Sequence, residues 1–81
     1  METGMEKTIN LLILSARHIL DDVKSSGTKV LLFSYYYNMV YSIYHAIGAA
    51  MGICHETNND QSYDLLVSLH DELKKILQVQ V

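Results

Sequence analysis

The apolar residues near the start of the chain recur at steps of three and four between residues 8 and 24. They are Ile9, Leu12, Ile13, Ala16, Ile19, Leu20 and Val23. This spacing places them on one face of an α-helix. Thr8 is a suitable N-cap for that helix, and Thr3 would serve if the helix began earlier. A polar segment then breaks the pattern: Gly27 can adopt the left-handed conformation that ends helices, and Thr28 can cap the next helix.

The longest apolar pattern follows, over residues 29–53. One row steps alternately by four and three, as in the seam of a coiled coil. Its members are Leu32, Tyr36, Met39, Ile43, Ala46, Ala50 and Ile53. A second row with the same spacing is polar at its start and small at its end, and comprises Ser34, Asn38, Tyr41, His45, Gly48 and Gly52. We therefore predict a long central helix whose last two glycines, in a GxxxG spacing, allow close contact with another helix.

A third amphipathic helix is predicted over residues 61–78, after a loop at residues 55–62. Its seam consists of Leu66, Leu69, Leu73 and Ile76. Asp60 or Ser62 can cap it. Because short connections favour antiparallel neighbours, the pattern predicts an all-α fold in which three helices form an up-down-up unit.

The central helix is apolar on more than one side, and a monomer of three helices would struggle to cover it. Pairing with a second copy is the natural remedy for so short a chain. We therefore expect a homodimeric helical bundle. The residues that we expect at the dimer contact are Leu32, Tyr36, Met39, Ile43, Gly48 and Gly52.

Composition narrows the classes of function. The chain has 81 residues, so a single domain covering residues 1–81 is expected. Its net charge is -3 and its six basic residues are scattered, which disfavours direct binding of nucleic acid. The single cysteine excludes an internal disulfide. Two glutamates precede the first apolar segment, where a signal peptide would carry basic residues, so we expect a cytoplasmic protein.

Residues 30–54 contain no Asp, Glu, Lys or Arg, which raises the alternative of a single-span membrane protein. Three features count against it. Tyr41 and Tyr44 lie in the middle of the segment rather than at its interfaces, and Asn38 and His45 would lie at a costly depth. The flanking amphipathic helices also need an apolar partner. We therefore predict a soluble protein with no membrane partner.

Candidate chemistry is sparse. Cys54, His55 and Glu56 are adjacent, but neighbouring residues at a helix end point in different directions. The chain has neither the CxxC nor the HxxxH pair with which zinc sites usually begin. It also offers no glycine-rich phosphate loop and no paired-carboxylate motif. We therefore expect no enzymatic activity, no metal and no cofactor.

The tyrosines are the unusual feature. Those at positions 35–37 project about 100° apart around a helix, so they cannot all face the core. Three interpretations stay open: core tyrosines with their hydroxyls at the rim, a partner-binding surface, or a small aromatic pocket inside a dimer. Tyrosine suits an interface because it has a large apolar body and a polar tip. The candidate partner-binding residues are Tyr37, Tyr41, Tyr44, His45 and Asn38.

The stretch YYYNMVYSIYHAIGAAM resembles the tyrosine-rich second helix of HEPN domains, which are helical RNA-associated modules. The resemblance covers one helix and implies a ligand- or nucleotide-associated helical domain as an alternative function. The nuclease motif of that family is an Arg followed four to six residues later by His. Here Arg17 directly precedes His18, and no Arg lies near His45.

The interpretation that we favour is a small, soluble, non-enzymatic interaction module. Its size, acidity and lack of a catalytic motif suit a regulator, an inhibitor, an immunity-type protein or a chaperone-like protein. It would bind a protein partner through the tyrosine-bearing face of its central helix.

Overall fold

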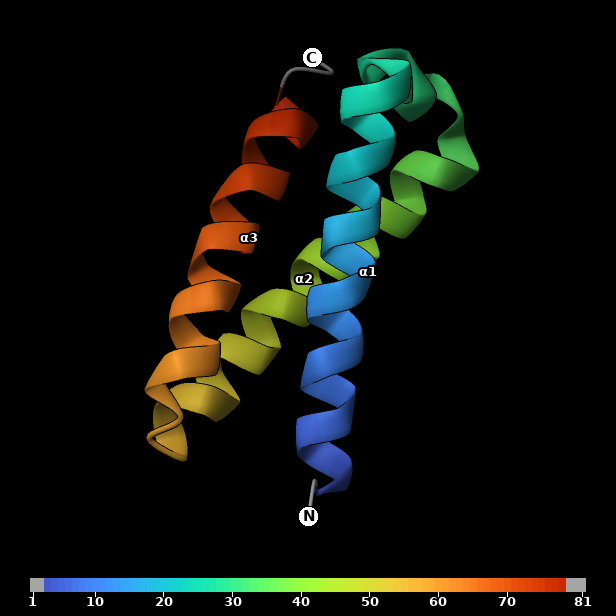
Figure 1. Ribbon diagram of the computed structural model, residues 1–81. Helices are drawn as coiled ribbons and strands as arrows, with labels where there is room; N and C mark the ends of the chain where they lie inside the picture. Colours follow the sequence, from blue (N-terminus) through green and yellow to red (C-terminus); the bar gives the residue numbers. More distant parts are fainter. Residues whose placement is uncertain (1–2, 79–81) are drawn as a thin grey trace.

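The computed structural model describes residues 3–78, apart from the side chain of Thr28, and this part of the chain is helical without any strand. The elements are α1 (Gly4–Ser26), the 3-10 turn η1 (Thr28–Leu32), α2 (Ser34–Glu56) and α3 (Asp60–Gln78). The all-α prediction is therefore confirmed. In Figure 1, α1 and α3 lie in front, and α2 crosses obliquely behind them.

The first helix begins earlier than its apolar pattern. The Thr3 hydroxyl accepts a hydrogen bond from the backbone N–H of Glu6 at 3.1 Å, so Thr3 is the N-cap. Thr8 lies inside α1, where its hydroxyl donates to the carbonyl of Gly4 at 3.0 Å. The prediction of Thr8 as the N-cap was therefore wrong, and the alternative cap Thr3 is confirmed.

The helix α1 ends at Ser26, directly before the glycine that was predicted to end it. Gly27 has a φ of +78°, a conformation that residues with a side chain rarely adopt, and its N–H donates to the carbonyl of Val23 at 2.8 Å. The prediction that Gly27 ends the helix is confirmed. The side chain of Thr28, the predicted cap of the next helix, lies outside the described part of the structure.

The residues predicted to open the central helix form η1 instead. Phe33 then takes an extended conformation, and α2 begins at Ser34. The helix α2 has 23 residues, as does α1, whereas α3 has 19, so the expectation that the central helix exceeds its companions holds for α3 and not for α1. The uncharged run in the sequence is thus divided between two elements.

The connection between α2 and α3 is tighter than predicted. Asn58 has a φ of +58°, and the N–H of Asn59 donates to the carbonyl of Cys54 at 2.9 Å, as in a Schellman motif. The side chain of Asn59 then accepts a hydrogen bond from the N–H of Ser62 at 3.4 Å. The side chain that caps α3 is therefore that of Asn59, and not of Asp60 or Ser62 as predicted.

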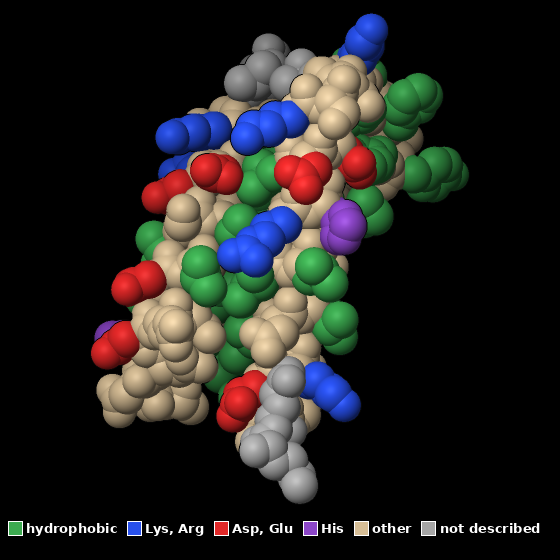
Figure 2. Space-filling view, in the orientation of Figure 1, with side chains coloured by type: hydrophobic (Ala, Val, Ile, Leu, Met, Phe, Trp, Pro, Cys, Tyr) green, Lys and Arg blue, Asp and Glu red, His purple; other side chains and the backbone are tan. Residues whose placement is uncertain are grey.

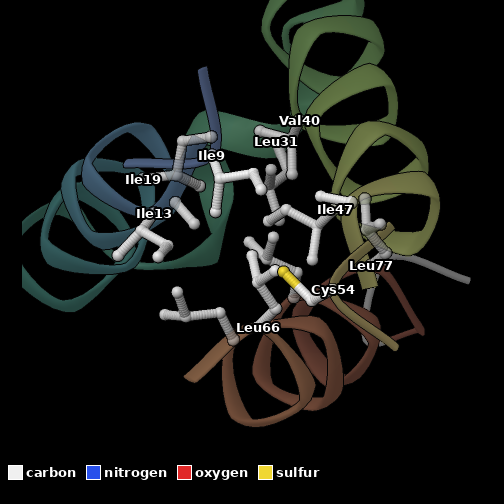
Figure 3. Close-up of a cluster of buried hydrophobic side chains, with 13 residues drawn as sticks. Ile9, Ile13, Ile19, Leu31, Val40, Ile47, Cys54, Leu66 and Leu77 are labelled. Atoms are coloured by element: carbon white, nitrogen blue, oxygen red, sulfur yellow. The ribbon is translucent and has the colours of Figure 1, made fainter. Parts of the chain in front are cut away.

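Hydrophobic side chains from all three helices and η1 form one core, part of which is visible between α1 and α3 (Figure 2). Figure 3 shows the buried side chains pointing toward one another, with the sulfur of Cys54 among them. The buried residues are Ile9, Ile13, Ala16, Ile19, Leu31, Val40, Ile47, Ala50, Cys54, Leu66, Leu69, Leu73 and Leu77. The row of α2 that enters this core is not the predicted seam, because only Ala50 belongs to both.

The membrane-spanning alternative finds no support. Within residues 3–78, every helix is too short or too polar to cross a bilayer. The segment that would have spanned it, residues 30–54, is interrupted at Phe33.

Candidate interaction surface

The predicted partner-binding residues of α2 form a chain of ring contacts. The rings of Tyr37 and Tyr41 are stacked with their centroids 6.2 Å apart. Tyr41 meets His45 edge to face at 4.5 Å, and Tyr44 meets His45 at 5.6 Å. Steps of three and four residues on one helix bring these rings together. We call these four rings, together with the ring of His70 of α3, the aromatic surface.

His70 extends this surface onto α3. Its ring stacks on that of Tyr44 with a centroid distance of 4.3 Å and an interplanar angle of 20°. Gly48 of α2 lies beside it: a Cβ there would lie 3.8 Å from Nε2 of His70, an ordinary contact distance. The sequence pattern did not group His70 with the tyrosines of the central helix. Its place beside the apolar seam of α3 marks it as facing a neighbour, but the pattern does not say which one.

The predicted partner-binding residues differ in how far they are buried. Tyr37 and Tyr44 are half-buried and pack against the core, whereas His45 and Asn38 are exposed. Tyr41 keeps 45 % of its surface exposed, although its ring contacts three neighbours. The tyrosines thus differ: some line the core, and Tyr41 projects from it.

A shallow groove runs beside the aromatic surface. It has a volume of about 240 Å³ and lies between α2 and the end of α3. Its walls are Tyr37, Tyr41, Tyr44, Lys74, Leu77 and Gln78. The groove is therefore mainly aromatic and apolar, with Lys74 as its single charged side chain.

The residues predicted at the dimer contact lie on two sides of α2. Met39 and Ile43 line a groove with residues of α1, and the hydroxyl of Tyr36 donates to a carboxylate oxygen of Asp22 on α1 at 3.2 Å. Gly48 instead lies beside α3. Gly52 is exposed one turn further along, and Leu32 is exposed in η1. The structure therefore does not bring the six residues into one patch.

The side chains of Cys54 and His55 point in different directions. Cys54 is fully buried, and this burial raises the pKa of its thiol. His55 is exposed, with its ring 6.2 Å from that of Tyr63. Within residues 3–78, no three side chains of His, Cys, Asp or Glu are placed to hold a metal ion together.

Comparison with known proteins adds no relative. No family model matches the chain, and neither the curated proteins nor the solved structures contain a significant match.

Proposed function

We propose that this protein is a small, non-enzymatic interaction module of the cytoplasm that binds a protein partner through its aromatic surface. Regulators, inhibitors, immunity-type proteins and chaperone-like proteins all work in this way. One observation carries the proposal: Tyr41 and His45 are in contact with each other and yet exposed.

The arrangement suits binding on energetic grounds. Aromatic side chains supply a large contact area, and tyrosine adds a hydroxyl that can reach a polar group of the partner. The contacts among Tyr37, Tyr41 and His45 restrict the motion of these rings before any partner arrives. Less side-chain entropy is then lost on binding. Tyrosine is also one of the residues that most often dominate the affinity of an interface.

The groove beside the surface indicates the chemistry of the partner. Its tyrosine and leucine walls would accept an apolar or aromatic side chain, and Lys74 at its edge would attract a carboxylate. We therefore infer a partner segment that carries an apolar residue next to an acidic one. In the same proposal, the helices form an up-down-up unit and two copies of the chain associate into a homodimer.

The test compares two exposed side chains of α2, one inside the aromatic surface and one outside it. Tyr41→Ala should lose capture of the partner from native lysate and leave the fold intact. Ile53→Ala is the control, because Ile53 is 38 % exposed on the same helix and belongs neither to the aromatic surface nor to the groove beside it. Tyr37→Ala is less suitable, since its ring packs against the core.

The outcomes separate the interpretations. Loss of capture with Tyr41→Ala and retention of capture with Ile53→Ala support the proposal. Equal capture by both variants and by the wild type would contradict it.

The ligand- or nucleotide-associated alternative receives less support from the surface. A larger hollow, of about 660 Å³, lies at η1, and its lining combines Lys29 and Ser26 with the apolar side chains of Val30, Leu32 and Phe33. A single cation offers little to a phosphate group.

A further inference from the structure

A second apolar surface lies away from the aromatic surface, along α1 and the start of α2. Leu11 and Leu14 of α1 are 60 % and 52 % exposed, although neither belongs to the stripe that enters the core. Phe33, Tyr35 and Met39 are also exposed. We call these five residues the α1–α2 face. In Figure 2, hydrophobic side chains project along the right-hand edge of the molecule, beyond α1.

A shared groove connects the two halves of this face. Its volume is about 250 Å³, and its walls include Ser15 and His18 of α1 and Met39 and Ile43 of α2. Leu14 lies one helical turn before His18, and Leu11 lies one turn before Ser15. Residues four apart on a helix are neighbours, so each leucine lies next to a residue that lines the groove. Tyr35 likewise lies one turn before Met39 on α2.

We propose that a second copy of this chain covers the α1–α2 face, which gives a location to the self-association in the proposed function. A two-fold interface uses the same patch on both copies, so the patch must carry both projections and the hollow that receives them. The α1–α2 face offers both: Leu14 and Tyr35 are exposed, and each lies one helical turn from a residue that lines the groove. A different partner would not require both features on one patch.

Charge also favours a second copy. In a two-fold contact, like charges near the axis approach each other and repel. The stretch of α2 and η1 from residue 30 to residue 54 carries no Asp, Glu, Lys or Arg. Asp22, which lines the groove on α1, accepts the hydrogen bond of Tyr36. The α2 side of the groove is therefore uncharged, as the centres of interfaces usually are, and Asp22 is the acidic side chain among the residues that line the groove.

The chain exposes more surface than is expected of a compact monomer of its mass. The accessible surface of the chain is 5599 Å². A monomeric protein of 9.2 kDa is expected to expose roughly 4,900 Å². The excess is close to the roughly 800 Å² that each partner buries in a standard interface. A dimer would thus bring the exposed surface per chain down to the usual range or below it.

The test measures mass in solution by light scattering. The wild type should have twice the 9.2 kDa mass of one chain at about 100 µM, and Leu14→Glu and Met39→Glu should have the mass of one chain. Leu65→Glu is the matched control, because Leu65 is 40 % exposed but lies on α3, which contributes nothing to the face. It should remain a dimer. Circular dichroism confirms that each variant is folded.

A milder substitution tests the face even if the variants with a new charge misfold. The double variant Leu14→Ala with Met39→Ala should raise the dissociation constant of the dimer at least about tenfold. A wild type that is monomeric at this concentration would overturn self-association and the assigned face together. A wild-type dimer that persists in all three face variants would overturn the face alone. Tyr41→Ala should keep the dimeric mass, so the partner proposal is tested separately.

Discussion

Tyr41 and Ile47 stand six residues apart on one helix and have opposite environments. Ile47 has no exposed surface, whereas Tyr41 keeps nearly half of its surface. Ile47→Ala should therefore lower the free energy of unfolding by about 2–4 kcal/mol, because it leaves a cavity in the core. Tyr41→Ala should lower it by less than about 1 kcal/mol. Urea unfolding of the two variants checks the difference, and equal losses would show that Tyr41 belongs to the core.

Cys54 offers a probe of core integrity. Its thiol is fully buried, and the raised pKa keeps it protonated, while the thiolate is the reactive form. At pH 8 the folded protein should react with a disulfide reagent at least about 100-fold more slowly than the denatured chain. Absorbance of the released thiolate follows the reaction. Comparable rates in the two states would mean that α2 does not bury this residue.

The same shift makes stability depend on pH. The pKa of Cys54 is higher in the folded state than its ordinary value of 9.0. The stabilising contribution is therefore complete below pH 9 and is lost as pH rises through the folded-state pKa. Unfolding midpoints of wild type and Cys54→Ala should draw closer between pH 8 and about pH 10 as this contribution disappears. A difference that stays constant over this range would contradict the assignment.

At the start of α1, the two threonines should differ in how much their substitution lowers stability. Thr3→Ala should destabilise the protein by about 1 kcal/mol, because it leaves the N–H of Glu6 without its cap. Thr8→Ala should change stability by less than about 0.5 kcal/mol, because its hydroxyl bonds a carbonyl already inside the helix. Thermal unfolding followed by circular dichroism compares them. A larger loss from Thr8→Ala would place the start of the helix later.

The sequence pattern predicted some elements better than others. In α1 and α3, charged residues occupy the outer positions, so the spacing of the apolar residues identified the buried face. In α2 no charge marks the outside, and several apolar rows compete. The spacing of Met39 and Ile43 is as regular as that of Val40 and Ile47, and only packing decides that the second row is buried. The caps at Thr3 and Asn59 follow local hydrogen bonds, for which the sequence offered several equivalent threonines, serines and aspartates.

The candidate site was predictable only within one helix. Steps of three and four placed Tyr37, Tyr41 and His45 on one side of α2, and the structure brings their rings into contact. The stacking of His70 on Tyr44 depends on how α3 lies against α2, which periodicity within a helix does not contain. For the same reason, the sequence grouped Gly48 with Met39 in one contact, although they lie on different sides of α2.

At the scale of the molecule, the bundle is elongated. Its extents are 39 × 21 × 19 Å, and its radius of gyration is 13.0 Å, against about 12 Å for a compact chain of this length. An elongated bundle buries less of its surface than a compact one. Two apolar surfaces, one aromatic and one along α1 and α2, lie on different sides of α2 and leave room for a second copy and a partner together.

We propose that the working form of this chain is an assembly that covers its apolar surfaces. Association of identical chains makes stability depend on concentration, because dilution favours the unfolded monomer. The most direct measurement is therefore the thermal midpoint of the wild type at different concentrations. We expect that raising the protein concentration from about 1 to about 100 µM increases the midpoint by about 10 °C. A midpoint that is the same at both concentrations would contradict it.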